Sequence, residues 1–315
     1  MQTLASFLLP RHIQLPNPEE RLVEVAPGIK VRCWCHWVSQ QEEERRNALT
    51  IIVVHGLEGS TDSQYMLGVA RDGLAVGMNV VRMNQRNCGG MDDCAPTLYN
   101  SSLSGDVAAV ARHVVEHDGV ANFALAGFSM GGNLVLKLAG EWGSQGPSQF
   151  RAVAAVCPAM DLAASADALH EPGNRIYEYY FMMQLFRRFR LKAKLFPGSF
   201  DPLRLRGISS LRGFDDRITA HYCGFTGADD YYARATATNV VDRIAVPSLI
   251  IHAANDPFVR IRPETRQRIL ANLNITFVET EDGGHCAFLG EHNGDPGDDG
   301  RWAEWELVGF LAKLR

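Results

Sequence analysis

The sequence predicts an α/β fold, in which a mostly parallel sheet is flanked by helices. Short apolar runs rich in β-branched residues alternate along most of the chain with longer runs that have helical periodicity. Runs such as "LTIIVVHG" (49–56) and "RAVAAVCPAM" (151–160) are continuously apolar, which is typical of strands buried on both faces. The 315 residues can bury a core without disulfide bonds and contain no internal repeat, so we expect one domain over 1–315.

The expected elements follow one another in a regular order. "RLVEVAPGIKVRCWCHWV" (21–38) predicts two strands around the turn "APG". Further strands are expected at 49–56, 78–84, 121–129, 151–160, 246–256 and 275–285. Helices are expected near 64–76 and at 102–119, 130–143, 262–273 and 302–314. Because the alternation lapses between 159 and 245, we predict a core of residues 22–158 and 246–315 with a helical cap inserted at 159–245.

Composition and charge exclude several classes of protein. The formal net charge of −5 leaves no basic excess, so we expect no nucleic-acid partner. No apolar run approaches the ~20 residues of a transmembrane helix. The opening "MQTLASFLLPRH" has an apolar patch but neither the positive flank nor the cleavage site of a signal peptide. We therefore expect a cytoplasmic protein.

The seven cysteines are odd in number, and none of their spacings matches a zinc motif. "CWC" (33–35) fits a strand with both thiols on one side. We interpret all seven as reduced structural thiols and expect no metal ion and no cofactor. The tract "EHNGDPGDDGR" (291–301) has a composition compatible with calcium binding, but we favour a solvated loop.

The segment "YEYYFMMQLFRRFRLKAKLF" (177–196) is aromatic, basic and helical in pattern. Our first interpretation is an amphipathic helix whose basic face lies in water. Residues 176–196 are also a candidate lid over an apolar site, or a surface for peripheral membrane contact. An ordinary packed helix pair explains the pattern as well as a lid does.

The motif "GFSMG" (127–131) follows an expected strand and opens an expected helix. This is the context in which G-x-S-x-G forms a nucleophile elbow. Gly127 and Gly131 lack side chains, so the strand and the helix can pass close to each other around the turn. Ser129 then projects its hydroxyl above the carboxyl edge of the sheet, next to the backbone N–H groups of a helix N-terminus. We predict that Ser129 is a nucleophile.

A serine hydroxyl is a weak nucleophile at neutral pH and needs a base, usually a histidine oriented by a carboxylate. In this kind of site the chain order is serine, acid, histidine. "IIHAANDPFV" places Asp256 just after a buried strand, and "VETEDGGHCAF" places His285 in the loop after the next strand. We therefore predict Asp256 as the acid and His285 as the base.

Other histidines and acids compete for these roles. The histidines that we weigh against His285 lie at positions 55, 113, 117, 170, 221, 252 and 292. None of them combines a late position with a loop after a strand and an acid one strand earlier. The alternative acids are Asp282, which lies very near His285 in sequence, and Asp229 or Asp230 in the irregular region.

An oxyanion hole completes such a site. "VVHGLEGS" ends a strand and continues into a polar loop. We expect the backbone N–H groups of Leu57 and Met130 to point into the site, where they would stabilise charge that develops in the transition state. We expect His55 to be structural and to fix the loop by hydrogen bonds.

Six stretches together carry a family resemblance: "HGLEGS" (55–60), "GFSMGGN" (127–133), "FDDRIT" (214–219), "GADDYY" (227–232), "NDPF" (255–258) and "GGHCAF" (283–288). The chain resembles the α/β-hydrolases over roughly residues 22–315. Within them it looks like the subgroup of medium-chain fatty-acid ethyl-ester synthase/esterases and related phospholipase-like hydrolases (YheT-like, AB hydrolase 4 family). The elbow is shared by the whole superfamily, whereas the spaced set of six is more specific.

The resemblance implies an α/β-hydrolase fold with Ser129 as nucleophile, Asp256 as orienting acid and His285 as base. Members of the subgroup act on carboxylic esters with acyl chains, and some transfer the acyl group to an alcohol. Eukaryotic membrane-bound members carry an N-terminal anchor, which we do not find in this sequence.

We therefore predict a serine hydrolase that cleaves carboxylic esters, with short- to medium-chain acyl groups, through a Ser-His-Asp triad and an acyl-enzyme. Its expected partner is a small-molecule acyl ester. The same triad supports acyl transfer to an alcohol or thioester hydrolysis, and these remain alternatives. A non-catalytic ligand-binding protein that keeps this fold is a further alternative.

Overall fold

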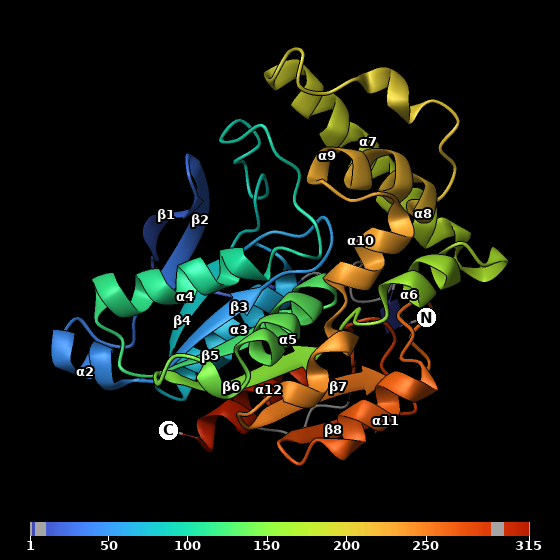
Figure 1. The fold of residues 1–315 in the computed structure, drawn as a ribbon. Coiled ribbons are helices and arrows are strands. Elements are labelled where there is room, and N and C mark those ends of the chain that lie inside the picture. Colours follow the sequence, from blue (N-terminus) through green and yellow to red (C-terminus); the bar gives the residue numbers. More distant parts are fainter. Residues whose placement is uncertain (1, 4–10, 291–298, 315) are drawn as a thin grey trace.

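The structure, a computed structural model, describes residues 2–3, 11–290 and 299–314. Within these residues, eight strands form one sheet in the order β1-β2-β4-β3-β5-β6-β7-β8 (Figure 1). The strands are β1 (Glu19–Ala26), β2 (Ile29–His36), β3 (Thr50–Val54), β4 (Asn79–Met83), β5 (Phe123–Phe128), β6 (Phe150–Val156), β7 (Ser248–Ala253) and β8 (Ile275–Thr280). The pairs β1–β2 and β2–β4 are antiparallel, and the other pairs are parallel. The predicted mostly parallel sheet is confirmed.

The central strands are buried because helices cover both faces of the sheet. Every residue of β3, β4, β5 and β7 is buried, as expected for continuous apolar runs. The antiparallel hairpin β1–β2 is more exposed and alternates, and its buried positions include Cys33 and Cys35 on one face. The interpretation of "CWC" as a strand with both thiols on one side agrees with this register.

Two hydrophobic clusters fill the two faces of the sheet. The helices α4 (Ser104–Asp118), α5 (Met130–Trp142) and α11 (Pro263–Ala271) contribute to one cluster. The helices α3 (Gln64–Ala75) and α12 (Trp302–Ala312) contribute to the other. A short helix, α2 (Glu42–Asn47), precedes β3 and buries none of its residues. The expected helices at 64–76, 102–119, 130–143, 262–273 and 302–314 are all present, with ends shifted by a few residues.

Residues 159–245, where the alternation lapses, contain α6 (Leu162–Leu169), α7 (Arg175–Leu195), α8 (Leu211–Phe214), α9 (Ala220–Cys223) and α10 (Ala228–Ala235). In Figure 1 these helices lie together beyond one end of the sheet. The division into a core and a cap with those boundaries stays a prediction. None of the helices among the described residues has the length and apolar character needed to cross a lipid bilayer.

The expectation that the basic face of residues 177–196 lies in water is partly wrong. Arg187, Arg190 and Lys194 are exposed, but Lys192 is fully buried and Arg188 is half-buried. Arg188 forms ion pairs with Glu58 and Asp92, which lie far away in the sequence. Lys192 donates to the side-chain oxygen of Asn87 and to the carbonyl oxygens of Asp92 and Ala95. These distant partners draw the two cations inward, and local periodicity does not reveal them.

The stretches "FDDRIT" and "GADDYY" pack against each other. Asp215 lies at the start of a π-helical turn (Asp215–Thr219), and its carboxylate accepts hydrogen bonds from Thr219 (2.7 Å) and Tyr232 (2.8 Å). Asp216 accepts a hydrogen bond from the N–H of Ala228 at 3.0 Å. Burial raises the pKa of Asp215 to about 6. These hydrogen bonds therefore join the two stretches within segment 159–245.

Candidate active site

Ser129 sits at a sharp turn between β5 and α5. Its backbone has φ 54° and ψ −118°, a conformation that non-glycine residues rarely adopt. A Cβ on Gly127 would lie 2.3 Å from the carbonyl oxygen of Gly131, and a Cβ on Gly131 would lie 2.2 Å from the carbonyl oxygen of Val54. Both glycines are therefore needed for the close passage of strand and helix, as the motif indicates.

The structure brings Ser129, His285 and Asp256 into one hydrogen-bonded chain. His285, in the loop after β8, places Nε2 2.9 Å from Oγ of Ser129. Its Nδ1 lies 2.8 Å from Oδ2 of Asp256, which follows β7. The other oxygen of Asp256 accepts the N–H groups of Phe258 (3.1 Å) and Val259 (2.9 Å). With Nδ1–H donated to Asp256, Nε2 is the acceptor for the Ser129 hydroxyl.

The negative charge of Asp256 and the positive charge of protonated His285 stabilise each other. Burial disfavours the imidazolium, but the Asp256 carboxylate more than offsets this and raises the pKa of His285 above its ordinary value. Burial also opposes ionisation of Asp256, yet the nearby imidazole and the two N–H donors keep its pKa below the ordinary value. A proton taken from Ser129 is therefore stabilised on His285.

The loop after β3 passes beside the serine. A Cβ on Gly56 would lie 3.1 Å from Cβ of Ser129. The N–H groups on either side of Leu57 are occupied, since Gly56 donates to the Tyr65 hydroxyl and Glu58 to the Tyr99 hydroxyl. Among the described residues, no acceptor is found for the N–H of Leu57 or for that of Met130, the first residue of α5.

His55 is buried and lies outside the hydrogen-bonded chain. Its Nδ1 donates to the carbonyl oxygen of Gly56 at 2.8 Å, and its Nε2 accepts the N–H of Gln85 at 3.1 Å. Burial lowers the pKa of His55 to about 4, so the ring is neutral. These bonds agree with the structural role that we expected.

The alternative acids point elsewhere. Asp282 accepts a hydrogen bond from Asn255 at 2.6 Å, Asp229 pairs with Arg212, and Asp230 accepts the N–H of Thr226. His292 and most of the acidic tract lie outside the described residues.

Two cavities reach Ser129. One has about 1030 Å³ of empty space, including its part open to solvent, and is lined mainly by apolar side chains such as Leu162, Phe181, Leu185 and Phe189. Part of α7 thus forms a wall of this cavity. The other has about 1080 Å³ and is lined by the loop after β3, by His285 and Cys286, and by charged groups farther out. Because Ser129 lines both cavities, a ligand with its reacting bond at Ser129 has room in each of them.

Sequence reasoning missed two residues at the N-terminus that hold the loop of His285. The N–H of His285 donates to Oγ1 of Thr3 at 2.8 Å, and the N–H of Leu289 donates to Oε1 of Gln2 at 3.0 Å. The stretch around them appears in the sequence only as an apolar patch. No local pattern indicates a contact between residues 3 and 285.

A family model described as the alpha/beta hydrolase fold matches residues 50–291. The chain belongs to the α/β-hydrolase fold family. This agrees with the order of its strands, with the elbow at Ser129 and with the family that the sequence resembles.

Named relatives place this α/β-hydrolase more narrowly. The putative esterase YheT of Escherichia coli is 31% identical over 293 residues, which are 92% of this chain and 84% of that protein. The phospholipase ABHD3 of Mus musculus is 30% identical over 241 residues, 76% of this chain and 58% of that protein. Both agree with the subgroup that the six stretches indicate.

A solved structure agrees on the fold. The esterase Pf2001 of Pyrococcus furiosus superposes with a TM-score of 0.59 at 15% sequence identity, covering 97% of this chain and 98% of that one. At this identity the likeness concerns the fold alone.

Proposed function

We propose that this α/β-hydrolase cleaves carboxylic esters of short- to medium-chain acyl groups through a covalent serine ester. The chain is a carboxylic ester hydrolase by class, in line with relatives named esterase and phospholipase. The observation that carries the mechanism is the hydrogen-bonded chain from Ser129 through His285 to Asp256, at the meeting point of two cavities.

In the first half-reaction, His285 takes the proton of Ser129 while Oγ attacks the ester carbonyl. The N–H groups of Leu57 and Met130 stabilise the oxyanion, each typically contributing about 10²–10³ in rate. Asp256 keeps the imidazole in the required tautomer and stabilises the imidazolium. The alcohol then leaves with the proton from His285, and the acyl group stays on Ser129.

In the second half-reaction, His285 takes a proton from water, which attacks the acyl-enzyme and releases the carboxylic acid. The mostly apolar cavity supports an acyl chain on one side of Ser129. The second cavity supports an alcohol group on the other side. The second cavity also has room for an acceptor alcohol. For this reason we keep acyl transfer to an alcohol as the second candidate function.

The test is hydrolysis of nitrophenyl esters with two to sixteen acyl carbons. We expect activity with an optimum at short to medium length, and a loss on the order of 10⁴-fold or more in Ser129→Ala. Ser148→Ala removes an exposed serine and is the matched control, with activity expected to be unchanged. An active Ser129→Ala variant would refute the serine mechanism.

Two further measurements separate the alternatives. Added short alcohols give new esters if acyl transfer competes with hydrolysis, and acyl thioesters test thioesterase activity. A wild-type protein that turns over none of these substrates would favour the non-catalytic ligand-binding alternative.

A further inference from the structure

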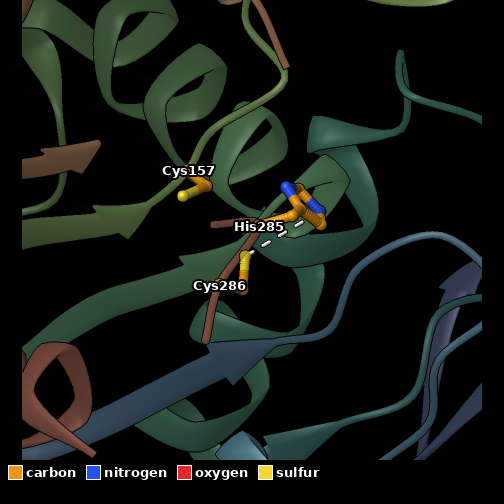
Figure 2. A group of neighbouring side chains, drawn as sticks. All are labelled: Cys157, His285 and Cys286. Atoms are coloured by element: carbon orange, nitrogen blue, oxygen red, sulfur yellow. Dashed lines mark hydrogen bonds between the residues drawn. The ribbon is translucent and has the colours of Figure 1, made fainter. Parts of the chain in front are cut away.

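Two cysteines flank His285 from separate parts of the chain. Cys286 follows it directly, and Cys157 follows the end of β6 (Figure 2). The two Sγ atoms and a ring nitrogen of His285 all lie within 4.8 Å of one another. Sγ of Cys286 lies 3.9 Å from Nε2 of His285, the nitrogen that faces Ser129.

The backbone holds both thiols in place. Cys157 has φ 44° and Cys286 has φ 57°, a region that residues with a side chain rarely enter. The N–H of Cys157 donates to the carbonyl oxygen of Ile251 at 2.7 Å, which anchors this turn to β7. The backbone therefore holds both residues beside the imidazole, and their thiols donate to the carbonyl oxygens of Gly284 and Val156.

Two thiols and an imidazole are the donor set that borderline-soft divalent cations prefer, zinc above all. The usual zinc bond lengths, about 2.3 Å to sulfur and about 2.0 Å to nitrogen, place donor atoms of one tetrahedral site about 3.5–3.8 Å apart. Sγ of Cys286 and Nε2 of His285 are 3.9 Å apart, close to this spacing, and the donor atoms of the three residues lie within 4.8 Å of one another. Closing the site therefore requires side-chain movements of up to about 1 Å.

The surroundings of His285 suit a metal ligand as well as a base. Zinc-bound histidines usually donate their other ring N–H to a carboxylate, which fixes the tautomer. His285 does so to Asp256 at 2.8 Å. Because Nδ1 is occupied by Asp256, the ring nitrogen left for a cation is Nε2, which faces Ser129 and lies 3.9 Å from Sγ of Cys286.

We propose that Cys157, Cys286 and His285 form an inhibitory binding site for Zn²⁺. Binding releases the protons of the two thiols, and the resulting thiolates and Nε2 coordinate the ion. The lone pair of Nε2 is then no longer available to the Ser129 hydroxyl, so acyl transfer stops until the metal leaves. The blocking of activity rests on the proposed function, whereas the metal site itself does not.

The ion has a route to the site and a clear preference among the donors. Cys286 lines the second cavity together with Ser129 and His285, so a cation can enter from there. A second group, Cys157 with His252 and Asp256, also brings donor atoms together, but all three of its residues are buried and Asp256 already binds His285. We therefore assign the site to the group in which two of the three donors, His285 and Cys286, line the cavity.

The first experiment titrates ZnCl₂ against nitrophenyl ester hydrolysis. Rates of the wild type, Cys157→Ser and Cys286→Ser are each expressed relative to the same protein without zinc. We expect wild-type inhibition that EDTA reverses, and a rise of at least about tenfold in the zinc concentration for half inhibition in either variant. Cys223→Ser, which changes a half-buried thiol on α9, is the control and keeps the wild-type value.

The second experiment measures metal binding directly, without relying on esterase activity. Co²⁺ is added to Ser129→Ala, which keeps both thiols and His285, and the thiolate-to-cobalt absorption band is followed. We expect one equivalent to saturate the band, and its loss when either Cys157→Ser or Cys286→Ser is combined with Ser129→Ala.

The outcomes are distinguishable. Equal zinc inhibition of the wild type and both cysteine variants, or a cobalt band that survives these changes, would overturn the site. A cobalt band that needs both thiols, without zinc inhibition of an active enzyme, would overturn the coordination by His285. If the wild type hydrolyses no ester, the proposed function fails while the cobalt titration still decides the metal site.

Discussion

Asp256 uses its two carboxylate oxygens for two different tasks. Oδ1 accepts backbone N–H groups of its own turn, which fix the carboxylate in place, and Oδ2 accepts the ring N–H of His285. Because Asp256 is buried, water screens this charge little. The carboxylate therefore raises the pKa of His285 more than an exposed carboxylate at the same distance would.

The pH dependence of the reaction follows from this charge. His285 acts as a base only when neutral, and its pKa is raised, so kcat/KM should rise with pH with a midpoint above the ordinary value of about 6.5. In Asp256→Asn the imidazolium loses its stabilising charge. We expect the midpoint to move to lower pH and the plateau rate to fall by about 10⁴-fold. The measurement is kcat/KM for a nitrophenyl ester across pH, and an unchanged midpoint in the variant would contradict this assignment.

At the scale of elements, the elbow depends on close contact between β3, β5 and α5. Gly131→Ala would place a Cβ against the carbonyl oxygen of Val54, which is backbone and cannot move aside. We expect the free energy of unfolding in urea to fall by about 3 kcal/mol or more.

A matched glycine separates this clash from the general effect of glycine-to-alanine changes. Gly105, on α4, has open space where a Cβ would lie. Gly105→Ala should leave stability unchanged or raise it by about 0.5 kcal/mol, because alanine loses less backbone freedom on folding. Equal effects of the two changes would argue against the packing explanation.

The loop of His285 is held by a segment from the other end of the chain. Thr3→Val keeps the shape of the side chain but removes the oxygen that accepts the N–H of His285. One such hydrogen bond contributes about 1 kcal/mol, so we expect kcat to fall by about three- to tenfold with a smaller change in KM. Thr3→Ser, which keeps the hydroxyl, should retain most of the activity. Equal losses in both variants would contradict a role for the hydroxyl.

The regular elements could be predicted from the sequence, because continuous apolar runs and glycine-bounded helices are local signals. The residues of the candidate site were also accessible, since Ser129, Asp256 and His285 each follow a strand in a recognisable order. Three features could not be predicted from the sequence: the inward direction of Arg188, the contact of Thr3 with His285, and the approach of Cys157 to Cys286. Each depends on partners far away in the sequence, which periodicity and spacing do not register.

At the scale of the whole molecule, Arg188 connects α7 to the loops at the end of the sheet. It pairs with Glu58 at 3.0 Å, next to Leu57, and with Asp92 at 3.0 Å, and it also donates to the carbonyl oxygen of Asn87. The side chain of Glu58 is only 7% exposed. This network ties the wall of the apolar cavity to the loop of the proposed oxyanion hole.

Loss of this arginine would leave the buried carboxylate of Glu58 without its charged partner, with the Tyr99 hydroxyl still donating to it at 2.6 Å. We expect Arg188→Gln to lower the free energy of unfolding by about 3–5 kcal/mol. Arg190→Gln changes an exposed arginine on the same helix and should stay within about 0.5 kcal/mol of the wild type. Urea unfolding of both variants measures the difference, and similar midpoints would show that the ion pair contributes little.

The division of the chain into residues 159–245 and the rest has a consequence for fluorescence spectroscopy. All five tryptophans lie outside residues 159–245, at positions 34, 37, 142, 302 and 305, whereas six of the eight tyrosines lie inside that segment. With excitation selective for indole, the emission therefore reports on the sheet and the helices that cover it. It does not report on helices α6–α10, which contain no tryptophan. Circular dichroism registers both. Comparing the two signals during urea unfolding shows directly whether α6–α10 melt together with the rest of the protein or before it.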